Sequence, residues 1–184
     1  MVAPSGESVV TPETMSATRG FALTGHWLVA ITIMIVILDQ VTKATVRSLL
    51  NLNESVSIVP GFLSFVHVRN TGVAFGLLNS ADIPLKPVLM TTIALASLIA
   101  LVFYAIRVTA KEPIARLSMA LIIGGAIGNL IDRATAGYVI DFVDVYWGDW
   151  HFWAFNVADS AITVGAGLLI LEMTFLRRHV SETV

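Results

Sequence analysis

VLMTTIALASLIALVFYAI, residues 88–106, contains no charged side chain. A helix that crosses a bilayer needs about 20 predominantly apolar residues, with a usual range of about 17–25. This stretch therefore predicts a transmembrane helix. Three more apolar runs, on either side of it, reach the same range. The four predicted spans are residues 21–41, 87–107, 116–132 and 155–176.

The composition agrees with a membrane protein. Of the 184 residues, 56% are hydrophobic and 13% are charged, with a mean hydropathy of +0.82. A soluble domain carries about 25% charged residues. We expect one membrane domain, residues 21–178, between a disordered cytoplasmic tail (1–20) and a short C-terminal cytoplasmic tail (179–184). The net charge of −2 gives no reason to expect a nucleic-acid partner, and the absence of cysteine excludes disulfides, thiolate metal sites and a cysteine nucleophile.

The basic residues predict the orientation of the spans. The loop between the second and third spans holds Arg107, Lys111 and Arg116, and more arginines follow the fourth span, whereas residues 134–154 hold no Lys or Arg. Loops rich in Lys and Arg stay in the cytoplasm. Both termini are therefore predicted to be cytoplasmic, with residues 44–85 and 134–154 outside.

The two outer segments have structural patterns of their own. Residues 57–69 are rich in Val, Phe and Ile around Pro60-Gly61, which predicts a strand, a turn and another strand. Residues 72–78 suggest a short helix lying on the membrane interface. A cluster of tryptophans at 147, 150 and 153 predicts that residues 134–154 dip into the outer leaflet. The predicted fold is an all-α membrane protein with four transmembrane helices, a small extracytoplasmic β-cradle and a short interfacial helix.

Polar residues collect at the predicted outer ends of the spans. Asp141 and Asp159 lie next to apolar runs. A carboxylate in such a place usually has a charged or hydrogen-bonding partner, or a functional role. Two carboxylates that meet cannot both ionise easily and share a proton, which is the chemistry of an aspartic protease. The other polar residues at this depth are Asp39, Lys43, Asn70, Asn129, Asp132, Arg133 and Asn156.

Several of these residues also have a purely structural interpretation. Asp39 and Lys43 are four residues apart and can form an ordinary helical ion pair. Arg133 can extend to the headgroups from a helix end, and Asn156 can simply cap the fourth span. Asp144, in the outer segment, is expected to be solvated.

Two other classes of protein remain open at this point, a small proton-coupled transporter or channel and a non-catalytic membrane scaffold. A transporter would distribute acids through the membrane depth. Among the acids within the predicted spans, only Glu172 lies away from the cluster.

Five sequence blocks together resemble one known family. They are Asp39-Gln40-x-x-Lys43, Asn70-Thr71-Gly72-Val73-Ala74-Phe75-Gly76, Gly124-Gly125-Ala126-Ile127-Gly128-Asn129-Leu130-Ile131-Asp132-Arg133, Val139-Ile140-Asp141-Phe142 and Phe155-Asn156-Val157-Ala158-Asp159-Ser160-Ala161. In this order they resemble lipoprotein signal peptidase, the type II signal peptidase of bacteria. The resemblance covers roughly residues 22–177 and does not reach the N-terminal tail.

The resemblance implies an aspartic endopeptidase of the bacterial cytoplasmic (inner) membrane, with its active site at the extracytoplasmic face. Its substrates are prolipoproteins with a diacylglyceryl-modified cysteine, cut just before that cysteine. The catalytic pair maps onto Asp141 and Asp159. Residues that match the family's substrate-side positions are Asn70, Asn129, Arg133 and Asn156, and supporting positions are Asp39, Lys43 and Asp132. The expected partners are membrane lipids and the cyclic peptide inhibitor globomycin. We expect a monomer without metal or organic cofactor.

Overall fold

The computed structural model describes residues 25–72, 83–108 and 112–176. Its helices are α1 (Gly25–Leu49), α2 (Lys86–Ala105), α3 (Pro113–Ala136) and α4 (Val157–Leu171), which continues as the π-helical turn η2 (Glu172–Leu176). All four are long and apolar enough to cross a membrane. The prediction of four membrane helices is therefore confirmed, although α1 extends to Leu49 beyond the predicted end at residue 41, and the chain is a multi-pass membrane protein. The predicted tails, and the interfacial helix beyond Gly72, lie outside the described residues.

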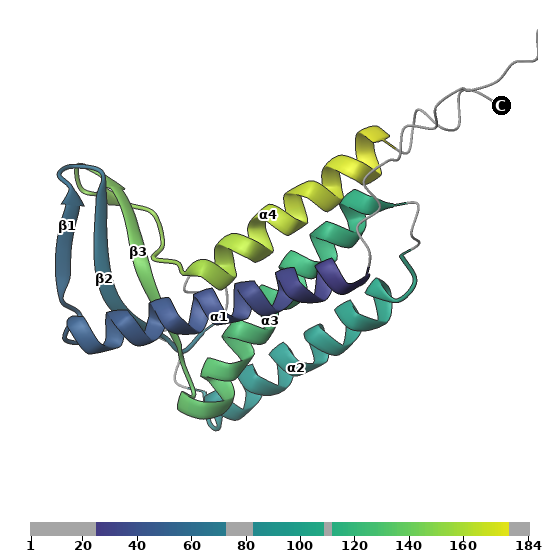
Figure 1. The fold of residues 1–184 in the computed structure, drawn as a ribbon. Coiled ribbons are helices and arrows are strands. Elements are labelled where there is room, and N and C mark those ends of the chain that lie inside the picture. Colours follow the sequence, from purple (N-terminus) through teal and green to yellow (C-terminus); the bar gives the residue numbers. More distant parts are fainter. Residues whose placement is uncertain (1–24, 73–82, 109–111, 177–184) are drawn as a thin grey trace, which may run out of the picture.

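Helix α3 is the centre of the bundle, because it contacts each of the other three spans (Figure 1). Gly124 and Gly128 permit its close approach to α1. A Cβ atom at Gly124 would lie 3.1 Å from the carbonyl oxygen of Thr32, and one at Gly128 would meet the carboxylate of Asp39. The Gly-x-x-x-Gly spacing thus brings two backbones together, as such spacings do in membranes.

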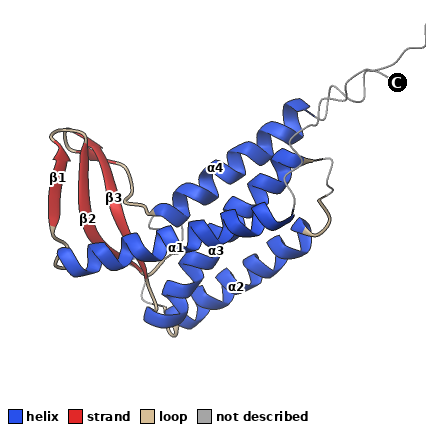
Figure 2. Cartoon of the chain, viewed as in Figure 1, coloured by secondary structure: helices blue, strands red, loops and turns tan. Residues whose placement is uncertain are grey.

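A small antiparallel sheet lies at one end of the bundle (Figure 2). Its strands, in spatial order, are β1 (Ser55–Val59), β2 (Leu63–Asn70), β3 (Val139–Trp147) and β4 (Trp150–His151). We call this end of the bundle, which the basic residues predict to face outside, the sheet end. The predicted cradle is confirmed, but residues 139–151 differ from the expected loop, since β3 is a largely buried strand.

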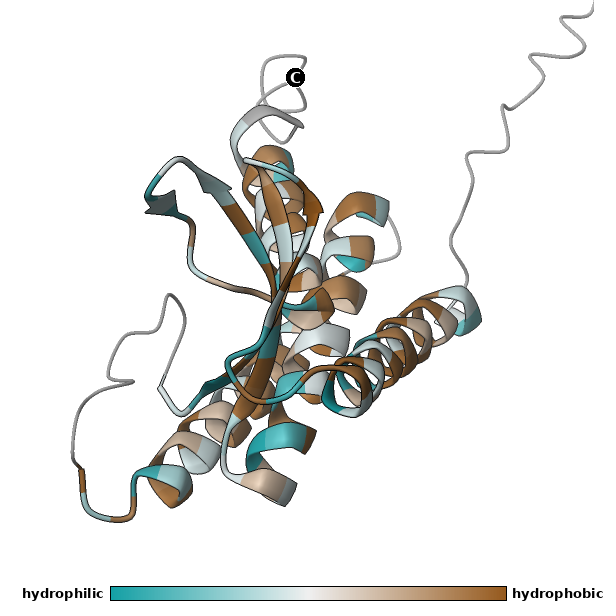
Figure 3. Cartoon of the chain, turned by 90° about the vertical axis from the view of Figure 1, so that its left-hand side faces the viewer, coloured by the Kyte–Doolittle hydropathy of each residue, from teal (hydrophilic) through white to brown (hydrophobic). Residues whose placement is uncertain are grey.

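The end of α1 supports the sheet. Val46 of α1 packs against Ile140 and Phe142 of β3, and these three buried side chains form the core beneath the strand. The helices are made largely of apolar residues (Figure 3), and those with exposed side chains include Ile33 and Ile37 on α1 and Phe103 on α2. In a membrane-spanning bundle such surface is solvated by lipid. One buried apolar cluster thus lies at the sheet end, where polar residues also gather.

Candidate active site at the sheet end

A buried triad of charges forms the base of the site. Nζ of Lys43 lies 2.8 Å from Oδ2 of Asp39 and 2.9 Å from Oδ2 of Asp132. Asp39 is fully buried, and only 1% of Lys43 is exposed. The predicted ion pair between Asp39 and Lys43 is confirmed. The ammonium also has a second carboxylate partner, so neither acid is left as an uncompensated buried charge.

The same carboxylates hold the backbone of neighbouring elements. Oδ1 of Asp39 accepts a hydrogen bond from the backbone N–H of Ala158 in α4, at 3.0 Å. Oδ2 of Asp132 accepts one from the backbone N–H of Ile140 in β3, at 3.3 Å. The triad on α1 and α3 therefore fixes the positions at which α4 and β3 begin.

Asn129 connects the triad to Asp159. Its Oδ1 accepts a hydrogen bond from Nζ of Lys43 at 2.9 Å, and its Nδ2 donates to Oδ1 of Asp159 at 2.8 Å. Lysine can only donate, so the carbonyl side of this amide must face Lys43 and the NH₂ side must face Asp159. The carboxylate on α4 is thereby linked to the charge on α1 through a single side chain on α3.

Asn156 joins the two aspartates that the sequence pairs. It caps α4, because its Oδ1 accepts from the backbone N–H of Asp159 at 2.9 Å while its own N–H donates to Oδ2 of Asp159 at 3.3 Å. Its Nδ2 donates to Oδ1 of Asp141 at 2.7 Å. The side chain is completely buried. Asn156 therefore has both the capping role and an orienting role toward a carboxylate.

Asp141 extends from β3 and is 3% exposed. Besides Asn156, Nδ2 of Asn70 on β2 donates to its Oδ2 at 3.1 Å. Burial, and after it the negative charge of Asp159, raise the pKa of Asp141 from 3.8 to about 7, against the lowering effect of hydrogen bonds from the two asparagines. A carboxyl group with such a pKa holds a proton near neutral pH, where ordinary aspartates are ionised.

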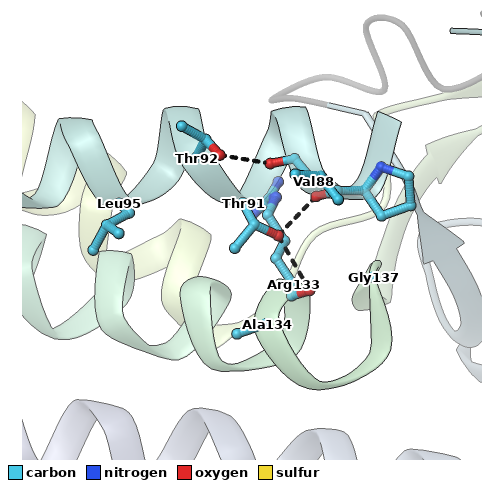
Figure 4. Close-up of a pocket in the computed structure, with 8 residues that line it drawn as sticks. Val88, Thr91, Thr92, Leu95, Arg133, Ala134 and Gly137 are labelled. Atoms are coloured by element: carbon cyan, nitrogen blue, oxygen red, sulfur yellow. Dashed lines mark hydrogen bonds between the residues drawn. The ribbon is translucent and has the colours of Figure 1, made fainter. Parts of the chain in front are cut away.

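Arg133, at the sheet end of α3, has two backbone partners. Its Nη2 donates to the carbonyl oxygen of Gly72 at 3.1 Å, and its Nη1 to that of Asn129 at 3.4 Å. The residue is half-buried and lines a pocket of about 420 Å³ between α2 and α3, opposite Thr91 and Leu95 (Figure 4). A side chain that only extended to headgroups would not need these contacts.

All nine residues singled out from the sequence thus belong to one connected network. Gln40 was missed, although it stands inside the first quoted block. Its Nε2 donates to Asp39, to Asp132 and to the carbonyl oxygen of Gly128. Among the residues that the structure describes, no three His, Cys, Asp or Glu side chains are placed to hold a metal ion.

The expectation for Asp144 was wrong. It is not solvated but buried, and Oδ2 accepts from Nδ1 of His151 at 2.9 Å. His151 also stacks on the ring of Tyr146, with ring centroids 5.1 Å apart. Asp144 pairs with Ser64 between β2 and β3, so it belongs to the sheet and not to a solvated loop. This pair is structural and separate from the network around Asp141.

Comparisons with known proteins agree with one another. Residues 31–175 match the model of the family described as signal peptidase (SPase) II. A lipoprotein signal peptidase of Geobacter metallireducens is 43% identical over 152 residues, which is 83% of this chain and 93% of the relative. One of Symbiobacterium thermophilum is 37% identical over 150 residues, 82% of this chain and 95% of the relative. A solved structure of a bacterial membrane enzyme superposes with a TM-score of 0.74 at 31% identity, covering 88% of this chain and 93% of the other.

Proposed function

We propose that this chain, which belongs to the signal peptidase II family and removes signal peptides from prolipoproteins, does so as an aspartic endopeptidase whose reacting groups are Asp141 and Asp159. The observation that carries the proposal is the position of Asn156, whose side chain donates to the carboxyl group of Asp141 while its backbone N–H donates to that of Asp159. The only charged partners of Lys43 are the acids of the triad among the residues described. The ammonium therefore does not form an ion pair with either reacting group.

The chemistry follows from a pair that holds one proton. Asp159, as the carboxylate, takes a proton from a water molecule while the water oxygen attacks the carbonyl carbon of the scissile bond. Asp141, as the acid, donates its proton to the carbonyl oxygen, which gives a neutral tetrahedral diol. Asp159 then gives its proton to the amide nitrogen while the ionised Asp141 takes one from a hydroxyl of the diol, and the C–N bond breaks. The products are a signal peptide with a new carboxyl end and a lipoprotein with a new amino group.

The supporting residues act through these two. Asn129 and Asn70 donate to the carboxyl groups, and Asp39, Lys43 and Asp132 hold the elements that carry them. Arg133 is the group proposed to bind a backbone carbonyl of the substrate, since its guanidinium already binds two such oxygens. No metal or organic cofactor is needed for this reaction.

Location and partners are part of the proposal. We propose a bacterial inner-membrane protein, monomeric, with both termini in the cytoplasm and the sheet end outside. The substrate is a prolipoprotein whose cysteine carries diacylglycerol, which keeps the scissile bond near the membrane surface. Membrane lipids and globomycin are the other proposed partners. The transporter alternative gains no support, because the comparisons match peptidases and the acids gather at one end of the bundle.

A cleavage assay tests the proposal. Purified protein in detergent is incubated with a synthetic precursor peptide whose cysteine carries diacylglycerol, and mass spectrometry identifies the products. Cleavage just before the modified cysteine is expected, and the same peptide without lipid is the control. Equal cleavage of both peptides would show that the lipid is not recognised. Folded protein that cleaves neither would refute the proposal.

Topology reporters at Lys111 and Asp149 should read cytoplasmic and external respectively.

A further inference from the structure

The hairpin that joins β3 to β4 has an exposed aromatic surface. Trp147, Trp150 and Trp153 are 79%, 63% and 59% exposed. We call these three residues the tryptophan tip. Monomeric soluble surfaces seldom expose several large aromatic rings together without a binding role. Residues 147–153 contain no Lys or Arg, their one acid is Asp149, and His151 among them is bound to Asp144, so the three tryptophans offer no free cation to a phosphate or to an acidic partner.

Trp153 cannot be far from the membrane. Trp153 precedes Val157, the first residue of the α4 span, by four positions, and an extended chain covers at most about 3.6 Å per residue. Ring contacts continue along the same segment, from Trp150 to Phe152 and from Phe152 to Phe155, with centroids 6.4 and 6.0 Å apart. In Figures 1 and 3 the strands run across the direction of the helices, so the sheet lies over the bundle end rather than prolonging it.

The tip is also firmly linked to the site. Asp141 and Trp147 both belong to β3, six positions apart, which is about 20 Å along a strand. The backbone N–H of Phe155 donates to the carbonyl oxygen of Val143 at 3.1 Å, and the N–H of Val143 donates back at 2.8 Å. Movement of the tip relative to the membrane would therefore tilt the strand that holds Asp141.

We propose that the tryptophan tip binds the headgroup region of the outer leaflet and thereby fixes the height of Asp141 above the membrane. Tryptophan favours this region because its ring is apolar and its N–H can still reach water or ester oxygens. Since no cation takes part, the contact should not require anionic lipid. The second half of the proposal rests on the proposed function, because the height of Asp141 is useful only if the scissile bond lies at the same depth.

Fluorescence tests the contact itself. The chain has four tryptophans, so Trp27→Phe leaves only those of the tip. This variant is placed in phosphatidylcholine vesicles with bromine at a shallow or a deep acyl position. Shallow bromine should quench emission more strongly than deep bromine, and anionic phosphatidylglycerol should not change the result. The proposal is overturned if neither bromolipid quenches and aqueous iodide quenches as strongly as it quenches free N-acetyltryptophanamide.

Activity tests the consequence. In vesicles, the double variant Trp147→Ser/Trp150→Ser should lose about tenfold in kcat/KM, as expected when two large aromatic contacts with the membrane are removed. In detergent with the same lipidated peptide it should match the parent. Asp149→Ser, at the same tip, is the control and should behave as the parent in both media. Equal loss in both media would overturn the proposal in favour of a packing role, and no loss in either would remove the functional role. If the parent protein cleaves nothing, the proposed function fails while the fluorescence result still decides the contact.

Discussion

Nδ2 of Asn129 donates to Oδ1 of Asp159 at 2.8 Å, and Lys43 determines that this amide points its NH₂ group that way. The amide is 8% exposed, and both of its polar atoms are engaged inside the protein. We therefore expect Asn129 to act on the reaction through Asp159 rather than by touching substrate. The sequence resemblance implies a substrate-side position for it, and a variant can distinguish the two roles.

Asn129→Asp tests that role with little change of shape. The introduced carboxylate can still accept from Lys43 but cannot donate to Asp159 unless it is protonated. A hydrogen bond to a charged group contributes about 1.5–3 kcal/mol, so kcat should fall by about 10- to 100-fold at neutral pH. Acidification should restore part of the activity, because the protonated group can donate again. A pH profile of kcat that matches the parent in shape would contradict this role.

Asp141→Asn and Asp159→Asn should each remove cleavage while the protein remains folded. Loss of general acid or base help costs about 10²- to 10⁴-fold in rate. Asp144→Asn is the matched control, because Asp144 lies three residues from Asp141 on the same strand but pairs with His151. Initial rates on the lipidated peptide should separate the first two variants from the control. Near-parental turnover by either would remove that residue from the proposed pair.

The pKa of Asp141, about 7 in the folded chain against an ordinary 3.8, makes a prediction about stability. Between these two values the folded state keeps a proton that the unfolded state releases. The contribution of this proton to stability should therefore be fully present below about pH 4 and be lost as the pH rises to about 7. Asp141→Asn cannot ionise and should lose this decline. Melting temperatures in detergent at pH 5 and pH 7.5 would check it, and an equal difference in parent and variant would speak against the raised pKa.

The same shift predicts an alkaline limb in the activity profile. Asp141 must carry its proton to act as the acid, so kcat/KM should fall as the pH rises above about 7. Asp144→Asn again serves as the control and should leave this limb unchanged. A flat profile from pH 6 to pH 9 would contradict the assignment of the acid.

The sequence predicts the spans and the members of the network because both depend on simple patterns. Apolar length defines the helices, and the rarity of polar residues near hydrocarbon singles out Asp39, Asn129 and Asp159. Partners across elements are harder to predict. Asp132 shares Lys43 with Asp39 only because α3 packs beside α1. Asn156 binds Asp141 only because the start of α4 lies beside β3. Asp144 shows the same limit, since its contact with His151 depends on how β3 and β4 pair.

Gly128→Ala should destabilise the protein. A Cβ atom there would meet the carboxylate of Asp39, which is already bound to Lys43 and cannot move freely. Overpacking of this kind costs about 1–3 kcal/mol. Gly167→Ala, in α4, is the control, because a Cβ there has open space and alanine is the better helix former. Thermal unfolding in detergent should show a lower melting temperature only for the first variant, and equal values would mean that α1 has room to shift.

Arg133→Lys distinguishes substrate binding from simple membrane anchoring. The guanidinium reaches two carbonyl oxygens with different nitrogens, those of Gly72 and Asn129. A lysine ammonium is a single compact group and cannot reproduce that planar fork. If Arg133 binds substrate, the variant should lose about tenfold in kcat/KM, mostly through a higher KM, because productive binding weakens before the chemical step. Arg107→Lys, at the opposite end of the bundle, is the control and should leave the kinetics unchanged. Lysine keeps a long stem and a positive head, so a membrane anchor would tolerate the change. Unchanged kcat/KM for Arg133→Lys would therefore assign the residue to the membrane surface and not to the substrate.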